Sequence, residues 1–170
     1  MIPGHHQPGA VEIYRTALSR LTPAVGADFA CIFLRDEDEP ELLRLTCALN
    51  WPQSSARFLA DLRIREGRGP TGRAVGTGRP VQVPNVFQDP GLQDWWTPAR
   101  ELGFVAMVSV PIVRHGRVAG AASFYFNDRR QVGLEDDELI ELVSRELNDA
   151  AALNSGRIAS PPHETEPGSR

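Results

Sequence analysis

Three glycines in the segment from Ile64 to Pro84 have the spacing of a phosphate-binding loop. Gly67, Gly69 and Gly72 satisfy G-x-G-x-x-G, in which small residues let a pyrophosphate approach backbone N–H groups at a helix start. That chemistry requires a buried parallel strand before the loop, whereas residues 62–66 alternate apolar and charged side chains like a half-exposed antiparallel strand. Pro70 also lies inside the loop. We therefore do not expect a dinucleotide site here.

The histidines are poorly placed for metal or hydrolase chemistry. His5, His6 and His163 fall in segments expected to be tails, and His115 falls at the tip of an expected hairpin. A metal site brings several His, Cys, Asp or Glu ligands together, and a hydrolase triad needs a histidine beside its serine. The sequence predicts neither a metal site nor a triad.

The two cysteines allow two interpretations. If the chain folds back around residues 38–39, Cys31 and Cys47 lie roughly opposite each other on neighbouring strands and form a redox-sensitive pair. The alternative, which we favour, is that both are reduced thiols in the core, because free cysteine behaves as a small buried hydrophobe. So few cysteines also suit a reducing compartment.

Composition excludes several classes of protein. A length of 170 residues with 41% hydrophobic content is typical of one domain with a single core. The sequence has no apolar run of about 18 residues and no signal-peptide pattern, so we expect a cytoplasmic protein without a membrane segment. A net charge of −4 gives no electrostatic footprint for nucleic acid.

Two amphipathic helices are expected to bracket the domain. Apolar residues recur at spacings of three and four in residues 11–21, before Pro23, and again in residues 140–150, after an acidic stretch at 135–138. Residues 1–9 and 155–170 are rich in Gly, Pro and polar side chains. We expect both of these ends to be disordered, which leaves residues 10–154 as the folded domain.

Between these helices the pattern changes to that of strands. Strands are expected at residues 28–35, 42–49, 81–83, 106–113 and 118–126, with a short one at 62–66. Short connections make neighbouring strands antiparallel. Residues 71–75 and 94–102 read as short helices over one face of the sheet. The fold class is therefore α+β, with the two long helices together on the other face.

Alternation along the last two strands places polar residues on one face. Ser109, Ser123 and Tyr125 share the side opposite to an all-apolar set that includes Val110 and Phe124. This mixed face is a candidate pocket or an ordinary solvent-facing side of an antiparallel sheet, and the pattern alone favours neither.

The chain resembles the GAF family of small-molecule sensor domains, in its stand-alone bacterial type. The likeness rests on residues 66–84, reading EGRGPTGRAVGTGRPVQVP, on the following Asp89, and on the SVPI segment at 109–112 before a Gly-containing hairpin. It implies a GAF-like (profilin/PAS-like) fold with a central antiparallel sheet of about five to six strands. It also implies a ligand pocket on the face under the short helices and loops.

The resemblance turns the mixed face and the segment over it into a candidate binding site. Paired tryptophans in the polar segment 85–96 need a core or a flat ligand to cover them, and lid packing is the simpler of the two explanations. A few polar groups nearby are expected to orient a ligand. The candidate pocket residues are Arg73, Asn85, Phe87, Asp94, Trp95, Trp96, Phe104, Met107, Ser109, Ser123 and Tyr125.

Catalytic and cofactor-binding relatives fit the sequence poorly. Free methionine sulfoxide reductases of this family use cysteines in the covering loops, and residues 67–111 contain none. No pocket histidine suggests haem, no cysteine there suggests a tetrapyrrole, and the cyclic-nucleotide pattern matches only in part. No cofactor is firmly implied and we do not expect an enzyme.

We therefore expect a cytoplasmic sensory or regulatory domain. It would bind a small molecule and signal through its terminal helices to a partner chain, such as a kinase or transcription regulator, or within a homodimer. The alternative is a dimerisation or protein-interaction module without a ligand. A redox sensor or a free methionine sulfoxide reductase-like enzyme is a minor alternative.

Overall fold

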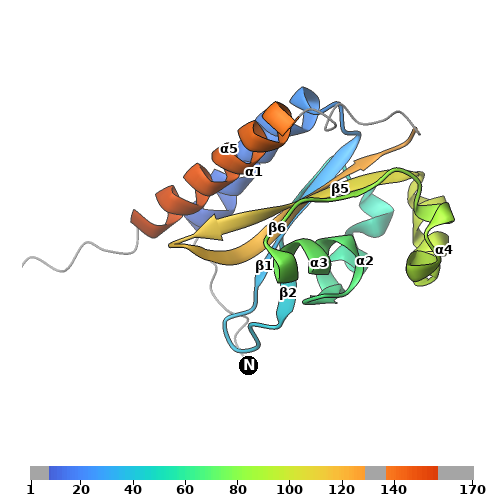
Figure 1. The fold of residues 1–170 in the computed structure, drawn as a ribbon, viewed down its shortest axis with the longest axis horizontal. Helices are drawn as coiled ribbons and strands as arrows, with labels where there is room; N and C mark the ends of the chain where they lie inside the picture. Colours follow the sequence, from blue (N-terminus) through green and yellow to red (C-terminus); the bar gives the residue numbers. More distant parts are fainter. Residues whose placement is uncertain (1–7, 129–136, 157–170) are drawn as a thin grey trace, which may run out of the picture.

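The secondary structure follows the hydrophobic pattern closely. The computed structural model describes residues 8–128 and 137–156 (Figure 1). Its elements in chain order are α1 (Pro8–Ala24), β1 (Phe29–Arg35), β2 (Leu42–Leu49), η1 (Gln53–Ser55), α2 (Ala56–Asp61), β3 (Arg63–Arg65), α3 (Gly69–Thr77), β4 (Val81–Val83), η2 (Val86–Gln88), η3 (Pro90–Leu92), α4 (Gln93–Leu102), β5 (Ala106–Arg114), β6 (Arg117–Phe126) and α5 (Asp137–Gly156).

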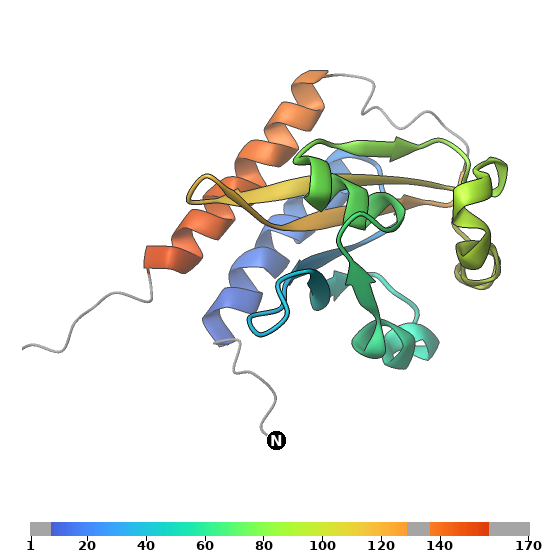
Figure 2. The ribbon, with the colours of Figure 1, turned by 60° about the horizontal axis from the view of Figure 1, so that its bottom comes forward.

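A six-stranded antiparallel sheet divides the domain into two layers. The strand order is β3-β2-β1-β6-β5-β4, so the longest strands lie in the middle and the three-residue strands β3 and β4 form the edges. Helices α1 and α5 lie side by side on one face, while α2, α3 and α4 lie on the other (Figures 1 and 2). The expected α+β architecture is confirmed.

The face of the sheet that α1 and α5 cover holds the larger of the two apolar cores. Val110 and Phe124 point into it, as alternation along their strands predicted, and they are fully buried with Leu18 of α1 and Leu147 of α5. The amphipathic stripes of both helices therefore pack on the sheet. Helix α1 ends at Ala24, so Pro23 lies in its last turn and does not itself stop it.

The bounds of the two terminal helices differ in part from those predicted. Helix α1 begins at Pro8 and thus includes the last two residues of the expected N-terminal tail. Helix α5 begins at Asp137. Of the acidic stretch expected to open this helix, residues 135–136 lie outside the described residues, as do most of the two expected tails.

The glycine motif serves the connection between β3 and α3. Gly67 and Gly69 have φ of +82° and +62°, values that favour glycine. A Cβ on Gly72 would lie 2.4 Å from the carbonyl oxygen of Arg65, so α3 approaches β3 too closely for any side chain there. The preceding strand is an antiparallel edge strand, as its alternation predicted, and lacks the context of a dinucleotide loop.

Cys31 and Cys47 do not lie opposite each other on the sheet, as the redox-pair interpretation required. Near the hairpin the register is the expected one, with Phe33 opposite Leu45, but an irregularity between Ile32 and Phe33 then shifts it by one residue. Cys31 consequently faces Ala48, and Cys47 faces Ile32. A one-residue shift reverses the side to which a side chain points. The two buried free thiols therefore belong to the cores on opposite faces of the sheet.

Candidate functional site

Two rows of side chains form the floor beneath the short helices. In one row Phe29 of β1, Tyr125 of β6 and Met107 of β5 are cross-strand neighbours. In the next row Cys31 pairs with Ser123, which in turn pairs with Ser109. Because side chains two residues apart share a face, both rows point toward α3 and α4. The polar strand residues thus lie where the alternation placed them, and they are buried.

Three hydroxyl groups meet at this floor. Thr71 of α3 places its Oγ1 2.7 Å from Ser123 Oγ and 3.3 Å from Ser109 Oγ, and the two serine oxygens are 2.7 Å apart. All three residues are almost fully buried. Each hydroxyl both donates and accepts, so the cluster satisfies itself away from water. It also attaches α3 to the two central strands.

Removing the middle hydroxyl is expected to destabilise the protein. In Ser123→Ala, Thr71 and Ser109 each lose their 2.7 Å partner in a buried site, so we expect the free energy of unfolding to fall by about 1–3 kcal/mol. Urea denaturation of this variant and of Ser19→Ala measures the effect. Ser19 is the control because its hydroxyl bonds to Arg15 O on the exposed side of α1. Equal midpoints for the two variants would contradict the role of the cluster.

Aromatic rings pack around Tyr125. Its ring stacks on Phe29 with 5.0 Å between centroids, and Trp51 and Phe104 meet it edge-on at 5.1 and 4.9 Å. The indole N–H of Trp51 donates to Ala30 O at 2.9 Å, which anchors that ring to β1. These geometries are the favourable ones for aromatic pairs. The cluster forms one end of the floor.

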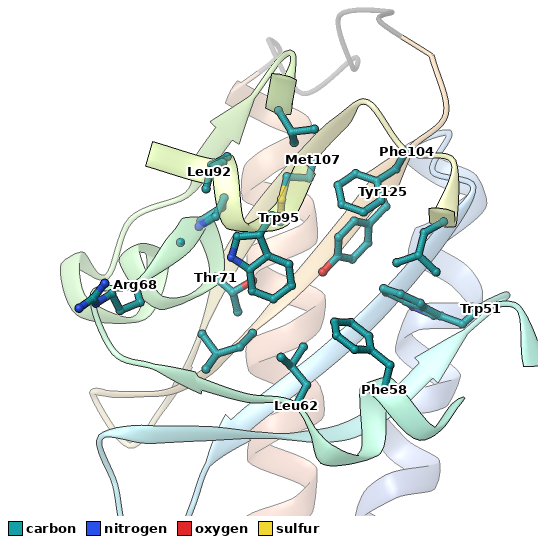
Figure 3. Close-up of a pocket in the computed structure, with 15 residues that line it drawn as sticks. Trp51, Phe58, Leu62, Arg68, Thr71, Leu92, Trp95, Phe104, Met107 and Tyr125 are labelled. Carbon is teal, nitrogen blue, oxygen red and sulfur yellow. The ribbon is translucent and has the colours of Figure 1, made fainter. Parts of the chain in front are cut away.

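The paired tryptophans of α4 have different surroundings. Trp96 Nε1 donates to Val86 O at 2.6 Å, and its ring lies 6.5 Å from Phe87, over which Arg100 is placed at 5.2 Å. Trp96 thus fixes α4 to η2. Trp95 instead lies over the floor beside Thr71 (Figure 3). Lid packing therefore explains Trp96, whereas Trp95 lines a cavity.

A small cavity lies between the floor and the short helices. Its volume is about 30 Å³, room for about two water molecules. Any larger ligand therefore requires the covering segments to move. Figure 3 shows the aromatic end and the end near α3. The lining residues are Trp51, Phe58, Leu62, Ile64, Arg68, Gly69, Pro70, Thr71, Val86, Leu92, Trp95, Leu102, Phe104, Met107 and Tyr125.

Four of the eleven candidate pocket residues line this cavity. They are Trp95, Phe104, Met107 and Tyr125. Four others contact residues of the lining or one another. Trp96 packs near Phe87 and donates to Val86 O, and Ser109 and Ser123 bond to Thr71.

The polar candidates outside the sheet do not line the cavity. Asn85 accepts a hydrogen bond from Phe87 N at 3.0 Å and caps η2. Arg73 is exposed with its Nη2 3.9 Å from Asp89 Oδ2, and Asp94 is exposed in the first turn of α4. Their roles are those of turn cap, surface ion pair and helix start.

Sequence reasoning missed much of the lining. Trp51 and Phe58 come from the segment between β2 and β3, which carries no motif and whose helix α2 is only six residues long. Thr71 lies within the glycine-rich segment, but nothing in one sequence shows that its hydroxyl meets Ser123. Phe58 is 42% exposed and also lines the cavity, so it lies between the cavity and solvent.

Burial keeps the ionisable groups of the floor neutral. Burial raises the pKa of Tyr125 well above its ordinary value, and the neighbouring Cys31 adds to the rise. Burial likewise raises the pKa of Cys31, whose thiol lies 3.7 Å from the Tyr125 hydroxyl. On the opposite face, burial raises the pKa of Cys47 to about 11. Neither cysteine is a thiolate near neutral pH, the form that attacks sulfur or a metal.

Alkaline pH is expected to destabilise the fold. An unfolded thiol titrates near 9.0, whereas the folded pKa of Cys47 is about 11. Above pH 9 the unfolded state releases a proton that the folded state keeps, so the free energy of unfolding falls as pH rises. This stabilising contribution is complete below pH 9 and is lost as pH rises through 11. Urea unfolding at about pH 8 and about pH 10.5 measures it, and Cys47→Ala should reduce the slope. A stability that rises over this interval would contradict the assignment.

Within residues 8–128 and 137–156, no three or more His, Cys, Asp or Glu side chains gather as metal ligands. None of the helices described there has the length and apolar character to span a membrane.

Comparison with known proteins identifies the family. The family model described as GAF domain matches residues 9–151, and the chain belongs to this family. Among proteins of curated function, none matches the chain in sequence. Membership of the GAF family supports a sensory or regulatory domain, since such domains are generally non-catalytic.

Solved structures show the same fold. A GAF domain/HD domain protein from Geobacter sulfurreducens has a TM-score of 0.71 at 12% identity, over 88% of this chain and 93% of the other. The GAF domain of a phosphoenolpyruvate-protein phosphotransferase from Coxiella burnetii has a TM-score of 0.67 at 18% identity, over 90% and 87%. A type II free methionine-R-sulfoxide reductase from Thermoplasma acidophilum has a TM-score of 0.57 at 14% identity, over 82% and 94%.

Proposed function

We propose that this chain is a cytoplasmic sensory domain that binds a small organic molecule between the sheet and the short helices α2, α3 and α4. The observation that carries the proposal is the aromatic-lined cavity beneath Trp95, with the half-exposed Phe58 at its wall. Ligand pockets are concave and mostly apolar with a few polar groups, and Trp95 and Tyr125 supply such groups here.

Ligand binding is proposed to change the position of the cover. A cavity of about 30 Å³ is closed to a molecule of several rings, so α2 and α4 must move outward when a ligand binds. Helix α3 transmits less movement, because the hydroxyl cluster attaches it to the central strands. The output passes through α1 and α5 to a partner chain, such as a kinase or transcription regulator, or to a second copy.

Native mass spectrometry tests this proposal. Gently purified wild-type protein is expected to retain a small molecule that Leu62→Trp loses, because an indole at this half-buried lining position fills the cavity. The matched control is Leu142→Trp, which adds the same side chain to an exposed position on α5. Retention by all three proteins places any ligand elsewhere and would falsify the proposed site.

The exposed side of α5 favours a second candidate function, that of an interaction module. Leu142 and Leu153 are 39% and 65% exposed on this helix, next to α1. Apolar side chains at such positions suit pairing with another helix. A homodimer through this face predicts that Leu142→Glu shifts the protein to monomer in sedimentation equilibrium. A wild-type monomer at all concentrations would remove this candidate.

The geometry gives the reductase alternative little support. The Thermoplasma acidophilum reductase shares the fold of this chain, but its sequence identity is too low to imply that this chain has the reductase activity. Cys31 and Cys47 lie on opposite faces of the sheet, both buried and both with raised pKa. A disulfide between them would require β2 to change register, so we propose a sensory domain and not an enzyme.

A further inference from the structure

We propose that the ligand is a planar aromatic molecule carrying an acceptor oxygen, a carbonyl or a carboxylate, that receives the indole N–H of Trp95. This inference rests on the proposed function, because it names the chemical class that the same cavity binds. It follows from the uneven distribution of apolar and polar groups along the cavity.

The three tryptophans near the cavity differ in their hydrogen bonds. Trp51 Nε1 donates to Ala30 O at 2.9 Å and Trp96 Nε1 donates to Val86 O at 2.6 Å. Trp95 Nε1 lies beside Gly69, and a Cβ built on this glycine would be 3.8 Å from the indole nitrogen. Within the described part of the chain, Trp95 Nε1 has no hydrogen-bond acceptor. A half-buried indole that covers a cavity usually finds a partner for its N–H. An oxygen of the ligand can supply that acceptor.

The end of the cavity near α3 carries one N–H without an acceptor in the described protein, that of Trp95. Thr71 and Arg68 also line this end, but the Thr71 hydroxyl is bonded to Ser109 and Ser123, and the Arg68 guanidinium at the rim is directed away from the cavity (Figure 3). Arg68 is exposed, and among the described residues no carboxylate pairs with it. None of the lining residues is acidic. This end is therefore suited to an acceptor and unsuited to a cation.

The opposite end favours a flat apolar body. Trp51, Phe58, Phe104 and Tyr125 gather there in Figure 3, and their lining surface is aromatic. The faces and edges of these rings pack favourably against a flat aromatic body in offset-stacked or edge-to-face contact. An aromatic body therefore lies between these side chains, with its oxygen toward Trp95.

Isothermal titration calorimetry with three matched probes tests the inference. The probes are 1-naphthamide, 1-naphthoate and 1-naphthylmethylammonium, which share a ring system and differ in their polar group. We expect the amide and the carboxylate to bind at least about tenfold more tightly than the ammonium, because only the first two present an acceptor oxygen without positive charge.

Two conservative variants assign the hydrogen bond. Trp95→Phe keeps an aromatic ring but removes the N–H, and we expect it to weaken 1-naphthamide binding about threefold to tenfold. Trp96→Phe is the matched control, because its N–H is already bound to Val86 O. Arg68→Gln then separates the two acceptors, since it should weaken only 1-naphthoate if the guanidinium turns inward to pair with the carboxylate.

Each result decides between the inference and the proposed function. Equal binding of all three probes, or equal effects of Trp95→Phe and Trp96→Phe, overturns the acceptor-oxygen class while the pocket still binds a ligand. Failure of all three probes to bind also overturns it. The proposed function itself fails only if wild type and Leu62→Trp retain the same bound mass in native mass spectrometry.

Discussion

Gly120→Ala is expected to destabilise the protein by about 3 kcal/mol, a large part of the stability of an ordinary domain. Gly120 lies in β6 between Leu34 of β1 and Ile112 of β5, at the centre of the sheet. A Cβ there would lie 2.1 Å from the carbonyl oxygen of Phe33 and 2.8 Å from Leu34 Cα. Both neighbours are backbone atoms, so the strands must separate to admit a methyl group.

Gly76→Ala is the matched control for this substitution. At position 76, near the end of α3, a Cβ would come no closer than 3.5 Å, to Glu66 Cγ, and alanine favours a helix by up to about 1 kcal/mol over glycine. The same added methyl should therefore stabilise the protein here and destabilise it at Gly120. Thermal and urea unfolding measure both variants, and a Gly120→Ala protein as stable as wild type would contradict the close approach of β1 and β6.

Tyr125→Ala is expected to cost about 3–5 kcal/mol, the range for removing a large buried aromatic ring. Its ring contacts Phe29, Trp51 and Phe104, and its loss leaves a void at the base of the candidate pocket. The wall that a ligand would contact is lost with it. Chemical denaturation measures the stability, and near-ultraviolet circular dichroism reports the packing of the remaining rings.

Tyr125→Phe separates the ring from the hydroxyl. It keeps the stacked geometry and removes the oxygen 3.7 Å from Cys31 Sγ, so we expect a loss of about 1 kcal/mol. If both substitutions cost the same amount, the hydroxyl network and not the ring packing would account for the stability at this position.

Most of the fold was predictable because the two faces of the sheet are covered by different helices, so alternate residues of a strand belong to different cores. Alternation placed Val110 and Phe124 under the long helices and Ser109 and Ser123 on the opposite side, and the structure agrees. Period-two patterns are informative in such a sheet, since a one-residue error would move every apolar side chain to the wrong side.

The cysteine geometry was not predictable for a related reason. The hairpin around residues 38–39 gives the expected register as far as Phe33 and Leu45, and one extra residue at Thr46 then changes it. Thr46 has no distinctive type, and bulges arise from backbone geometry that a single sequence does not display. Two residues that were expected to face each other therefore lie on opposite sides of the sheet.

The candidate site was predictable only in its floor. Tyr125 and Met107 follow from strand alternation, and Trp95 from its conspicuous position in a polar segment. The cover depends on tertiary packing. Phe58 comes from a short helix without a sequence signal, while Asn85 resembles a ligand-binding group but caps a turn. Short polar side chains in loops have so many local backbone partners that residue type alone does not show which of them face a ligand.

The central claim is that a movable cover closes a ligand pocket, and amide hydrogen exchange of the intact protein tests it most directly. If α2 and α4 open to admit a ligand, their amides should exchange at least about tenfold faster than those of the central strands β5 and β6. Addition of 1-naphthamide should then slow exchange in α2 and α4 and leave α1 and α5 unchanged. Exchange in α2 and α4 that is as slow as in the central strands, with or without the probe, would show a permanently filled core and contradict the sensor account.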